Sequence, residues 1–257
     1  MVSYIKNMSE IIKSYADLDF HKNIGALIKN QSVNKQDIRD VVNRLIDWDS
    51  IRGMLDIGCG YGWFEEKIEK HLDFICGIDC LSENETDFLK KANMVADKAD
   101  FINLLLPAPI NLPSDSFDLV VSAYSLYFFP GAIPEVKRVL HRGGTFVVIT
   151  HSEYMLEEGE RFFDFANLRK VIKGFAAENG ESILKEHFSD IIAIDYRNAL
   201  LFSKQHREEL ANYIDFKKEF IAKDVDPAVV RKKMLEELDQ KGNVRFNKND
   251  RVFIVKK

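Results

Sequence analysis

A turn that almost lacks side chains follows the first apolar strand of this chain. The strand ends at Leu55-Asp56-Ile57, and Gly58, Gly60 and Gly62 come next at every second position. Glycine adopts left-handed backbone conformations at little cost and has no Cβ atom, so a ligand can contact the backbone of such a turn directly. The pattern therefore predicts an α/β fold with a ligand bound where this strand ends.

A second apolar run, Phe74-Ile75-Cys76-Gly77-Ile78, ends in the acid Asp79. This acid follows the glycine turn by about twenty residues, the spacing of a ribose-binding carboxylate in nucleotide-binding α/β folds. The two segments together predict a cofactor that contains an adenosyl group.

The glycine spacing argues against a dinucleotide. The dinucleotide pattern places its third glycine where a helix packs closely on a strand, and Trp63 occupies that position here. The helix predicted to start at Trp63 carries Glu65 and Glu66 in its first turn, where carboxylates would repel a phosphate. The turn therefore suits a cofactor without phosphate, with a nicotinamide-dependent oxidoreductase as the alternative.

Composition limits the class of protein. The chain has 257 residues, of which 46% are hydrophobic and 30% charged, enough for one α/β domain with helical additions. A net charge of −5 gives no general attraction to nucleic acid, and the first residues lack the apolar run of a signal peptide or membrane span. We therefore expect a cytoplasmic protein without nucleic-acid or membrane partners. Three cysteines without C-x-x-C spacing predict neither a disulfide framework nor a metal site.

Apolar runs alternate with helical periods from about residue 52 to 150, which predicts a parallel sheet with right-handed crossovers. Prolines predict an extended loop over 104–112. Outside this region we expect helices over about 3–15, 34–47, 159–180 and within 205–242, and strands over 191–196 and 251–255. Asn179-Gly180 is expected to end one helix as a left-handed cap, and Asp226-Pro227 to start another.

The segment Asp56-Ile57-Gly58-Cys59-Gly60-Tyr61-Gly62 resembles the first motif of the class I S-adenosylmethionine-dependent methyltransferases. Three further segments match that family in the same order, at Gly77-Ile78-Asp79, 112–122 and 138–149, so that the likeness covers about residues 50–152. Within the family, residues 175–180 and the late helical insertion resemble bacterial type 11-like small-molecule methyltransferases.

The resemblance implies a Rossmann-like three-layer α/β sandwich with a mostly parallel seven-stranded sheet whose last strand is antiparallel. A single domain would span 1–257, with an N-terminal helical cap over about 1–45, a core over 46–204 and 243–257, and a helical insertion over 205–242. The cap and the insertion are expected to select the substrate.

The resemblance also implies in-line transfer of a methyl group from S-adenosylmethionine to a small molecule, with S-adenosylhomocysteine as product. Gly58 and Gly60 would admit the methionine half, Asp56 would orient its amino group, and Asp79 would bind the ribose. Oxygen, nitrogen and carbon acceptors all stay open. The expected cofactor-binding residues are Asp56, Gly58, Cys59, Gly60, Tyr61, Gly62, Asp79, Asp100, Phe101, Ser122 and Ala123.

The adenine-binding residues are the least constrained part of this set. Asp100-Phe101 fits the family by residue type, but the gap from there to Phe117-Asp118 is longer than the family's usual gap. Asp97 and Asn103-Leu104 are therefore alternatives for this role.

Three residues are candidates for catalysis. His151 and Glu153 follow the fifth strand at its carboxyl end, the edge where α/β sheets bind ligands, and either can act as a general base. Tyr127 follows the fourth strand and could place an aromatic face beside the cationic sulfonium. The alternatives are a surface histidine at a strand end and a tyrosine packed in the core. A non-catalytic cofactor-binding or scaffold protein of the same fold is a separate alternative to an enzyme.

Overall fold

The computed structural model describes residues 11–12, 15–162, 166–218 and 225–257. The chain divides into two compact units, the larger made of 36–153, 172–196 and 250–257, the smaller of 1–35, 154–171 and 197–249. The single domain over 1–257, with its cap, core and insertion boundaries, stays a prediction.

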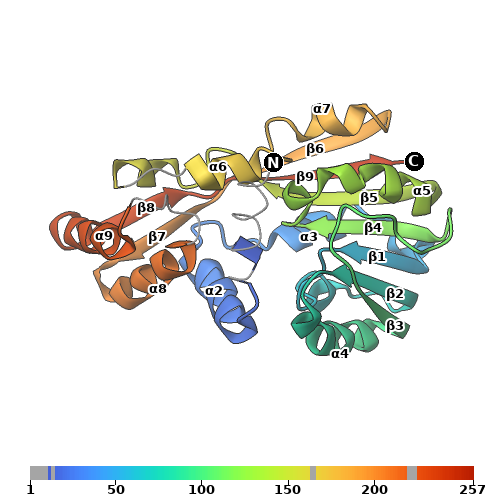
Figure 1. Cartoon of the computed structure of the whole chain (residues 1–257), viewed down its shortest axis with the longest axis horizontal. Helices are drawn as coiled ribbons and strands as arrows, with labels where there is room; N and C mark the ends of the chain where they lie inside the picture. Colours follow the sequence, from blue (N-terminus) through green and yellow to red (C-terminus); the bar gives the residue numbers. More distant parts are fainter. Residues whose placement is uncertain (1–10, 13–14, 163–165, 219–224) are drawn as a thin grey trace. The chain divides into compact units, whose positions relative to one another are not determined.

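A seven-stranded sheet forms the larger unit, in the order β3-β2-β1-β4-β5-β9-β6. Its strands are β1 (Gly53–Ile57), β2 (Leu72–Asp79), β3 (Ala96–Asn103), β4 (Phe117–Ala123), β5 (Leu140–His151), β6 (Asp190–Tyr196) and β9 (Asp250–Lys256). All neighbours are parallel except β9, which runs antiparallel between β5 and β6 (Figure 1). The predicted sheet, with its antiparallel last strand, is confirmed.

The central strands are buried on both faces. Leu119, Val120 and Val121 in β4 have no exposed surface, and neither do Met54 and Leu55 in β1. Parallel strands covered by helices on both faces have such continuous apolar runs. The strands whose carboxyl ends meet at one edge of the sheet, β1, β2, β4 and β5, are therefore part of a closely packed core.

The connection from β1 to β2 differs from the prediction. The helix expected to start at Trp63 is wrong, because this segment has only turns and one 3₁₀ turn at Glu65–Lys67. The glycine turn extends to residue 62, and the segment that remains before Leu72 is too short for a stable helix. The later crossovers do contain helices, α4 (Glu85–Val95) and α5 (Ile133–Val139).

The helix predicted over 159–180 is also wrong. Two shorter helices appear, α6 (Ala166–Ile172) and α7 (Gly180–Lys185), and Asn179 lies directly before the start of α7 instead of at the end of a helix. A Cβ atom at Gly180 would lie 2.8 Å from the rings of Phe175 and Phe253, so close packing explains this glycine. The Asn-Gly pair therefore marks a tight crossing and not a left-handed cap.

Helices and a two-stranded antiparallel sheet make up the smaller unit. It contains α2 (Leu18–Gln31), α8 (Arg207–Lys217), α9 (Pro227–Lys241) and the strands β7 (Ala199–Ser203) and β8 (Asn243–Asn247). The helices predicted within 205–242 are confirmed for the described residues as α8 and α9. Asp226 caps α9, as predicted, by accepting from the Ala228 amide. The strands β7 and β8 were not predicted.

The predicted N-terminal helices have different outcomes. The helix over 3–15 falls largely on residues outside the described ones. The second, over 34–47, is the shorter α3 (Ile38–Asn43), capped by Asp37. Over the described parts of the chain, every helix is too short or too polar to cross a bilayer.

Candidate functional site

The glycine turn after β1 has an open side and a closed side. Gly58, Gly60 and Gly62 all have positive φ angles, of 69°, 52° and 77°. A Cβ atom at Gly58 would lie 2.4 Å from the Ser125 side chain, whereas one at Gly60 would meet nothing within 4 Å. The backbone is thus packed at the first glycine and accessible at the second, as a cofactor that presses against the turn requires.

Asp79, at the end of β2, ties that strand to the turn. Its carboxylate accepts hydrogen bonds from the Gly60 amide at 2.9 Å, the Leu81 amide at 2.9 Å and the Asn84 side chain at 3.2 Å. Burial raises the pKa of this carboxyl, although the hydrogen bonds act in the opposite direction. An ionised carboxylate can accept from several donors at once, so a ribose hydroxyl is a suitable partner for it.

Asp56 and Glu65 form a pair of buried carboxyls beside the same turn. Their exposed fractions are 2% and 1%. Asp56 Oδ1 and both carboxyl oxygens of Glu65 have no hydrogen-bond donor among the described residues. Burial, with the charge of Glu65, raises the pKa of Asp56 well above its ordinary value, and burial raises the pKa of Glu65 to about 7. The sequence alone indicates Glu65 only as an acid in the first turn of a predicted helix.

The residues considered for adenine binding lie at different positions along strand β3. Asp100 is exposed, pairs with Cys76 in the register, and accepts from the Phe101 amide. Asn103 pairs with Asp79 at the carboxyl end of the strands, and its side chain donates to the Asp79 carbonyl. Of these residues, Asn103 therefore lies at the edge where the glycine turn and Asp79 meet.

Buried hydroxyl contacts fix the end of β4. Ser122 Oγ lies 2.7 Å from Ser125 Oγ, and the Ser125 hydroxyl donates to the Ile57 carbonyl at 2.8 Å. These contacts hold the segment after β4 against the end of β1. Ala123, partly exposed, and Tyr124, with a φ angle of 59°, follow at this edge.

His151 is held by a residue that sequence reasoning missed. Its Nδ1 atom lies 2.7 Å from Asp250 Oδ1, and the Tyr124 hydroxyl donates to Asp250 Oδ2 at 2.8 Å. The Asp250 side chain is 2% exposed and that of His151 13%. The Tyr124 ring also stacks on the imidazole, with centroids 4.5 Å apart. A buried carboxylate at Nδ1 fixes the proton there and makes Nε2 the basic nitrogen.

Two other catalytic candidates have different surroundings. Tyr127 is buried and lies near His151, with ring centroids 5.9 Å apart. Glu153 forms an ion pair with Lys173 at 3.3 Å, and its backbone amide donates to Glu178. His151 and Tyr127 are thus brought together, whereas the carboxylate of Glu153 is engaged by a lysine.

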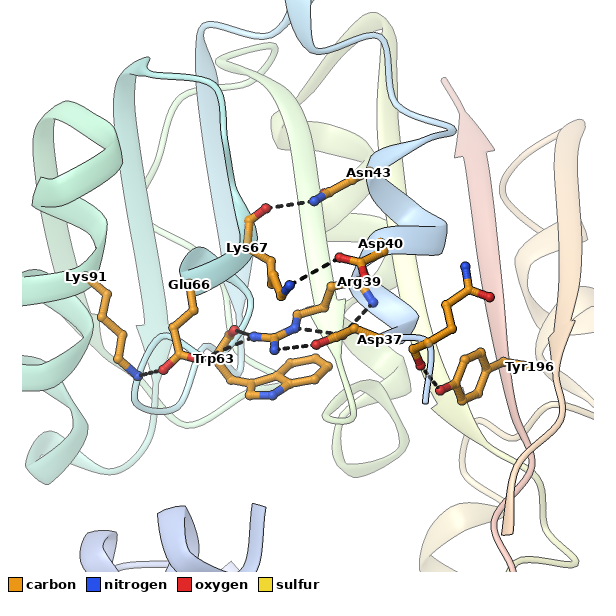
Figure 2. A network of polar contacts seen from close by, with 10 residues as sticks. Asp37, Arg39, Asp40, Asn43, Trp63, Glu66, Lys67, Lys91 and Tyr196 are labelled. Atoms are coloured by element: carbon orange, nitrogen blue, oxygen red, sulfur yellow. Dashed lines mark hydrogen bonds and ion pairs between the residues drawn. The ribbon is translucent and has the colours of Figure 1, made fainter. Parts of the chain in front are cut away.

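A buried arginine connects α3 with the segment after the glycine turn (Figure 2). Arg39, 4% exposed, donates to Asp37 at 2.7 Å and to the Trp63 carbonyl, and its guanidinium lies 4.2 Å from the Trp63 ring centroid. Glu66 lies 3.4 Å from Arg39 and 2.6 Å from Lys91, which in turn lies 4.3 Å from the Tyr61 ring centroid. These contacts, and not a helix, hold the segment after the glycine turn. No local pattern in the sequence indicates that Arg39 has this structural role.

Comparison with protein families gives one match. Residues 55–148 match a family described as "Methyltransferase domain". The match begins in β1, includes the glycine turn and Asp79, and ends within β5. No curated protein is similar enough to this chain to count as a relative.

Several solved structures share the fold at low identity. The YcgJ protein from Bacillus subtilis is 16% identical, with a TM-score of 0.59 over 85% of this chain and 97% of that one. The plantazolicin methyltransferase BpumL, solved in complex with SAH, is 14% identical, with a TM-score of 0.51 over 97% and 95% of the two chains. The cyclase SpnF is 18% identical, with a TM-score of 0.52 over 85% and 79%. These likenesses concern the fold, and a fold does not fix the reaction.

Proposed function

We propose that this chain is a class I S-adenosylmethionine-dependent methyltransferase that methylates a small molecule whose attacking atom carries a proton. The family match over residues 55–148 and the seven-stranded sheet support this proposal. The observation that carries this proposal is the contact of His151 with the buried carboxylate of Asp250. A positioned base is needed where the nucleophile must lose a proton.

The residues around the glycine turn fit the cofactor. Open space at Gly60 suits close approach of a nucleoside to the backbone. Three carboxyl oxygens of Asp56 and Glu65 lack a donor among the described residues, which suits an ammonium group, and the carboxylate of Asp79 can accept from a ribose hydroxyl. For adenine binding we propose Asn103-Leu104 in preference to Asp100-Phe101, because Asn103 pairs with Asp79 at the carboxyl end of the strands.

S-adenosylmethionine, when bound, supplies a methyl group on a positively charged sulfur, which is an activated leaving group. The protein must then orient the acceptor and remove its proton. Asp250 accepts from Nδ1 of His151, so Nε2 of the neutral ring takes the acceptor's proton and the buried carboxylate stabilises the resulting imidazolium. Tyr124 keeps Asp250 in place through its hydroxyl.

Two features support a small acceptor with a hydroxyl or amine group. The net charge of −5 gives no general attraction to nucleic acid. His151 and Tyr127 contribute a largely buried imidazole and phenol, which suits a compact acceptor. The roles of the N-terminal segment and of residues 205–242 in acceptor choice stay predictions.

The test is transfer of a labelled methyl group from S-adenosylmethionine to a panel of hydroxyl and amine metabolites. We expect a labelled product with wild type and a loss of about 10² to 10⁴ in kcat for His151→Gln, the range for removing a general base. His141→Gln is the matched control, since His141 is a half-exposed histidine at the other end of β5. Binding of S-adenosylhomocysteine without any transfer, or full activity of His151→Gln, would refute the proposal.

A further inference from the structure

The loop of residues 57–64 is closed by two acids that contact each other. Asp56 is the penultimate residue of β1 and Glu65 follows the loop, and their carboxyls lie close enough to hydrogen bond to each other when one is protonated. Three of their four oxygens have no donor among the described residues. Two ionised carboxylates cannot share a buried contact, so one of them must keep a proton.

The surroundings do not neutralise this pair. The carboxylate of Asp79 faces it from β2, and the Cys59 thiol lies next to it in the turn. Lys91 of α4 and Glu66 act on Glu65 with opposite signs, and they form an ion pair with each other at 2.6 Å. The net balance of the groups facing the pair is therefore negative, which favours a bound cation.

We propose that Asp56 and Glu65 hold a shared proton in the unliganded protein and exchange it for the ammonium group of the cofactor's amino acid. The inference rests on the cofactor assignment of the preceding section, and it adds Glu65 and the proton exchange. No covalent bond changes; the proton passes to solvent as the ammonium enters. Both carboxyls then ionise and accept from its N–H groups, which satisfies the buried oxygens that lack donors.

Two measurable consequences follow. Binding of S-adenosylhomocysteine releases a proton and therefore tightens as the pH rises, by up to about tenfold per pH unit. The range must lie below about 7.7, where an α-amino group begins to lose its own proton. A nucleoside that lacks the amino acid, such as 5′-methylthioadenosine, releases no proton and binds with an affinity that does not change with pH.

The experiment is isothermal titration with S-adenosylhomocysteine from about pH 5.5 to 7, in two buffers of different ionisation enthalpy. Wild type is expected to show a buffer-dependent heat and a Kd that falls with pH. Glu65→Gln is expected to flatten both responses, because an amide neither titrates nor repels Asp56. Glu69→Gln, which removes an exposed carboxylate from the same connection, is expected to behave as wild type.

The outcomes separate this inference from the cofactor assignment. Binding that is independent of pH and buffer overturns the proton exchange and leaves the assignment intact. A full pH response in Glu65→Gln overturns the role of Glu65. No binding at any pH contradicts both. If Glu65→Gln does not fold, the two-buffer titration of wild type and the comparison with 5′-methylthioadenosine still decide the question.

Discussion

The two halves of the candidate site are built in different ways. The cofactor half, at the ends of β1 and β2, consists mainly of backbone and carboxylates, with Asp79 and Gly60 joined across 19 residues. The acceptor half, at the ends of β4, β5 and β9, depends on side chains, with His151 and Asp250 joined across 99 residues. The first half thus depends mainly on local chain geometry and the second on tertiary structure. A substitution in one half should therefore impair its own function, cofactor binding or catalysis, without impairing the other.

The largest expected effect is on the cofactor half. Gly60→Val fills the open space at the turn and should abolish detectable binding of S-adenosylhomocysteine, a loss of more than about 10³-fold if several contacts are blocked. Its matched control is Gly143→Val, because Gly143 also has a positive φ angle and no atom within 4 Å of an added Cβ. Both variants should lose similar stability from left-handed strain, but only the first should lose binding in a calorimetric titration.

The second prediction concerns the acceptor half. Asp250→Asn keeps the shape but removes the charge that fixes the His151 tautomer, so kcat should fall by about 10²-fold and its pH profile should change. Asp195→Asn, which removes a carboxylate paired with Arg251 between β6 and β9, should leave both unchanged. An unchanged pH profile in Asp250→Asn would mean that Asp250 only supports packing.

The third prediction concerns stability without cofactor. The pKa of Glu65 is raised from 4.5 to about 7, so the folded protein binds a proton more tightly than the unfolded chain. The free energy of unfolding should therefore fall as the pH rises through this interval, by at most about 3 kcal/mol. Urea unfolding of Glu65→Gln at both ends of the interval should show a smaller slope than wild type or Glu69→Gln. Equal slopes would show that Glu65 is ionised throughout.

The smallest expected effect is on the ribose contact. Asp79→Ala should weaken S-adenosylhomocysteine by about 1 to 3 kcal/mol, since buried polar groups lose their partner. Asp118→Ala is the matched control, because that carboxylate also accepts from two backbone amides, those of Arg52 and Gly53, at the opposite end of the sheet. Both should lower the melting temperature. Equal affinity of the two variants would move the ribose site elsewhere.

The same contrast explains what the sequence could predict. The glycine turn, the sheet and the start of α9 at Asp226 depend on local conformational preferences and apolar runs, which a single sequence displays. His151 was found as a strand-end residue, but Asp250 required the antiparallel register of β5 and β9. A register of this kind is not encoded locally.

Two helices were mispredicted because tertiary packing decided the local structure. After Trp63 the chain forms a 3₁₀ turn held by Arg39, and at Gly180 it begins a helix where two aromatic rings leave no room for a Cβ atom. The pairing of Asp56 with Glu65 could not be predicted from the sequence either, because it depends on how the loop brings Glu65 back to the end of β1. Helix propensity and glycine patterns are weak predictors of local structure where tertiary contacts of this kind favour another conformation.

The most direct test of the central claim compares the affinity of S-adenosylhomocysteine for wild type, Gly60→Val and Asp250→Asn in one calorimetric series. The account predicts that Asp250→Asn binds as wild type does and that Gly60→Val does not bind. If both variants bind equally well, or if both lose binding, the glycine turn and the His151–Asp250 pair are not the separate cofactor and acceptor halves described above.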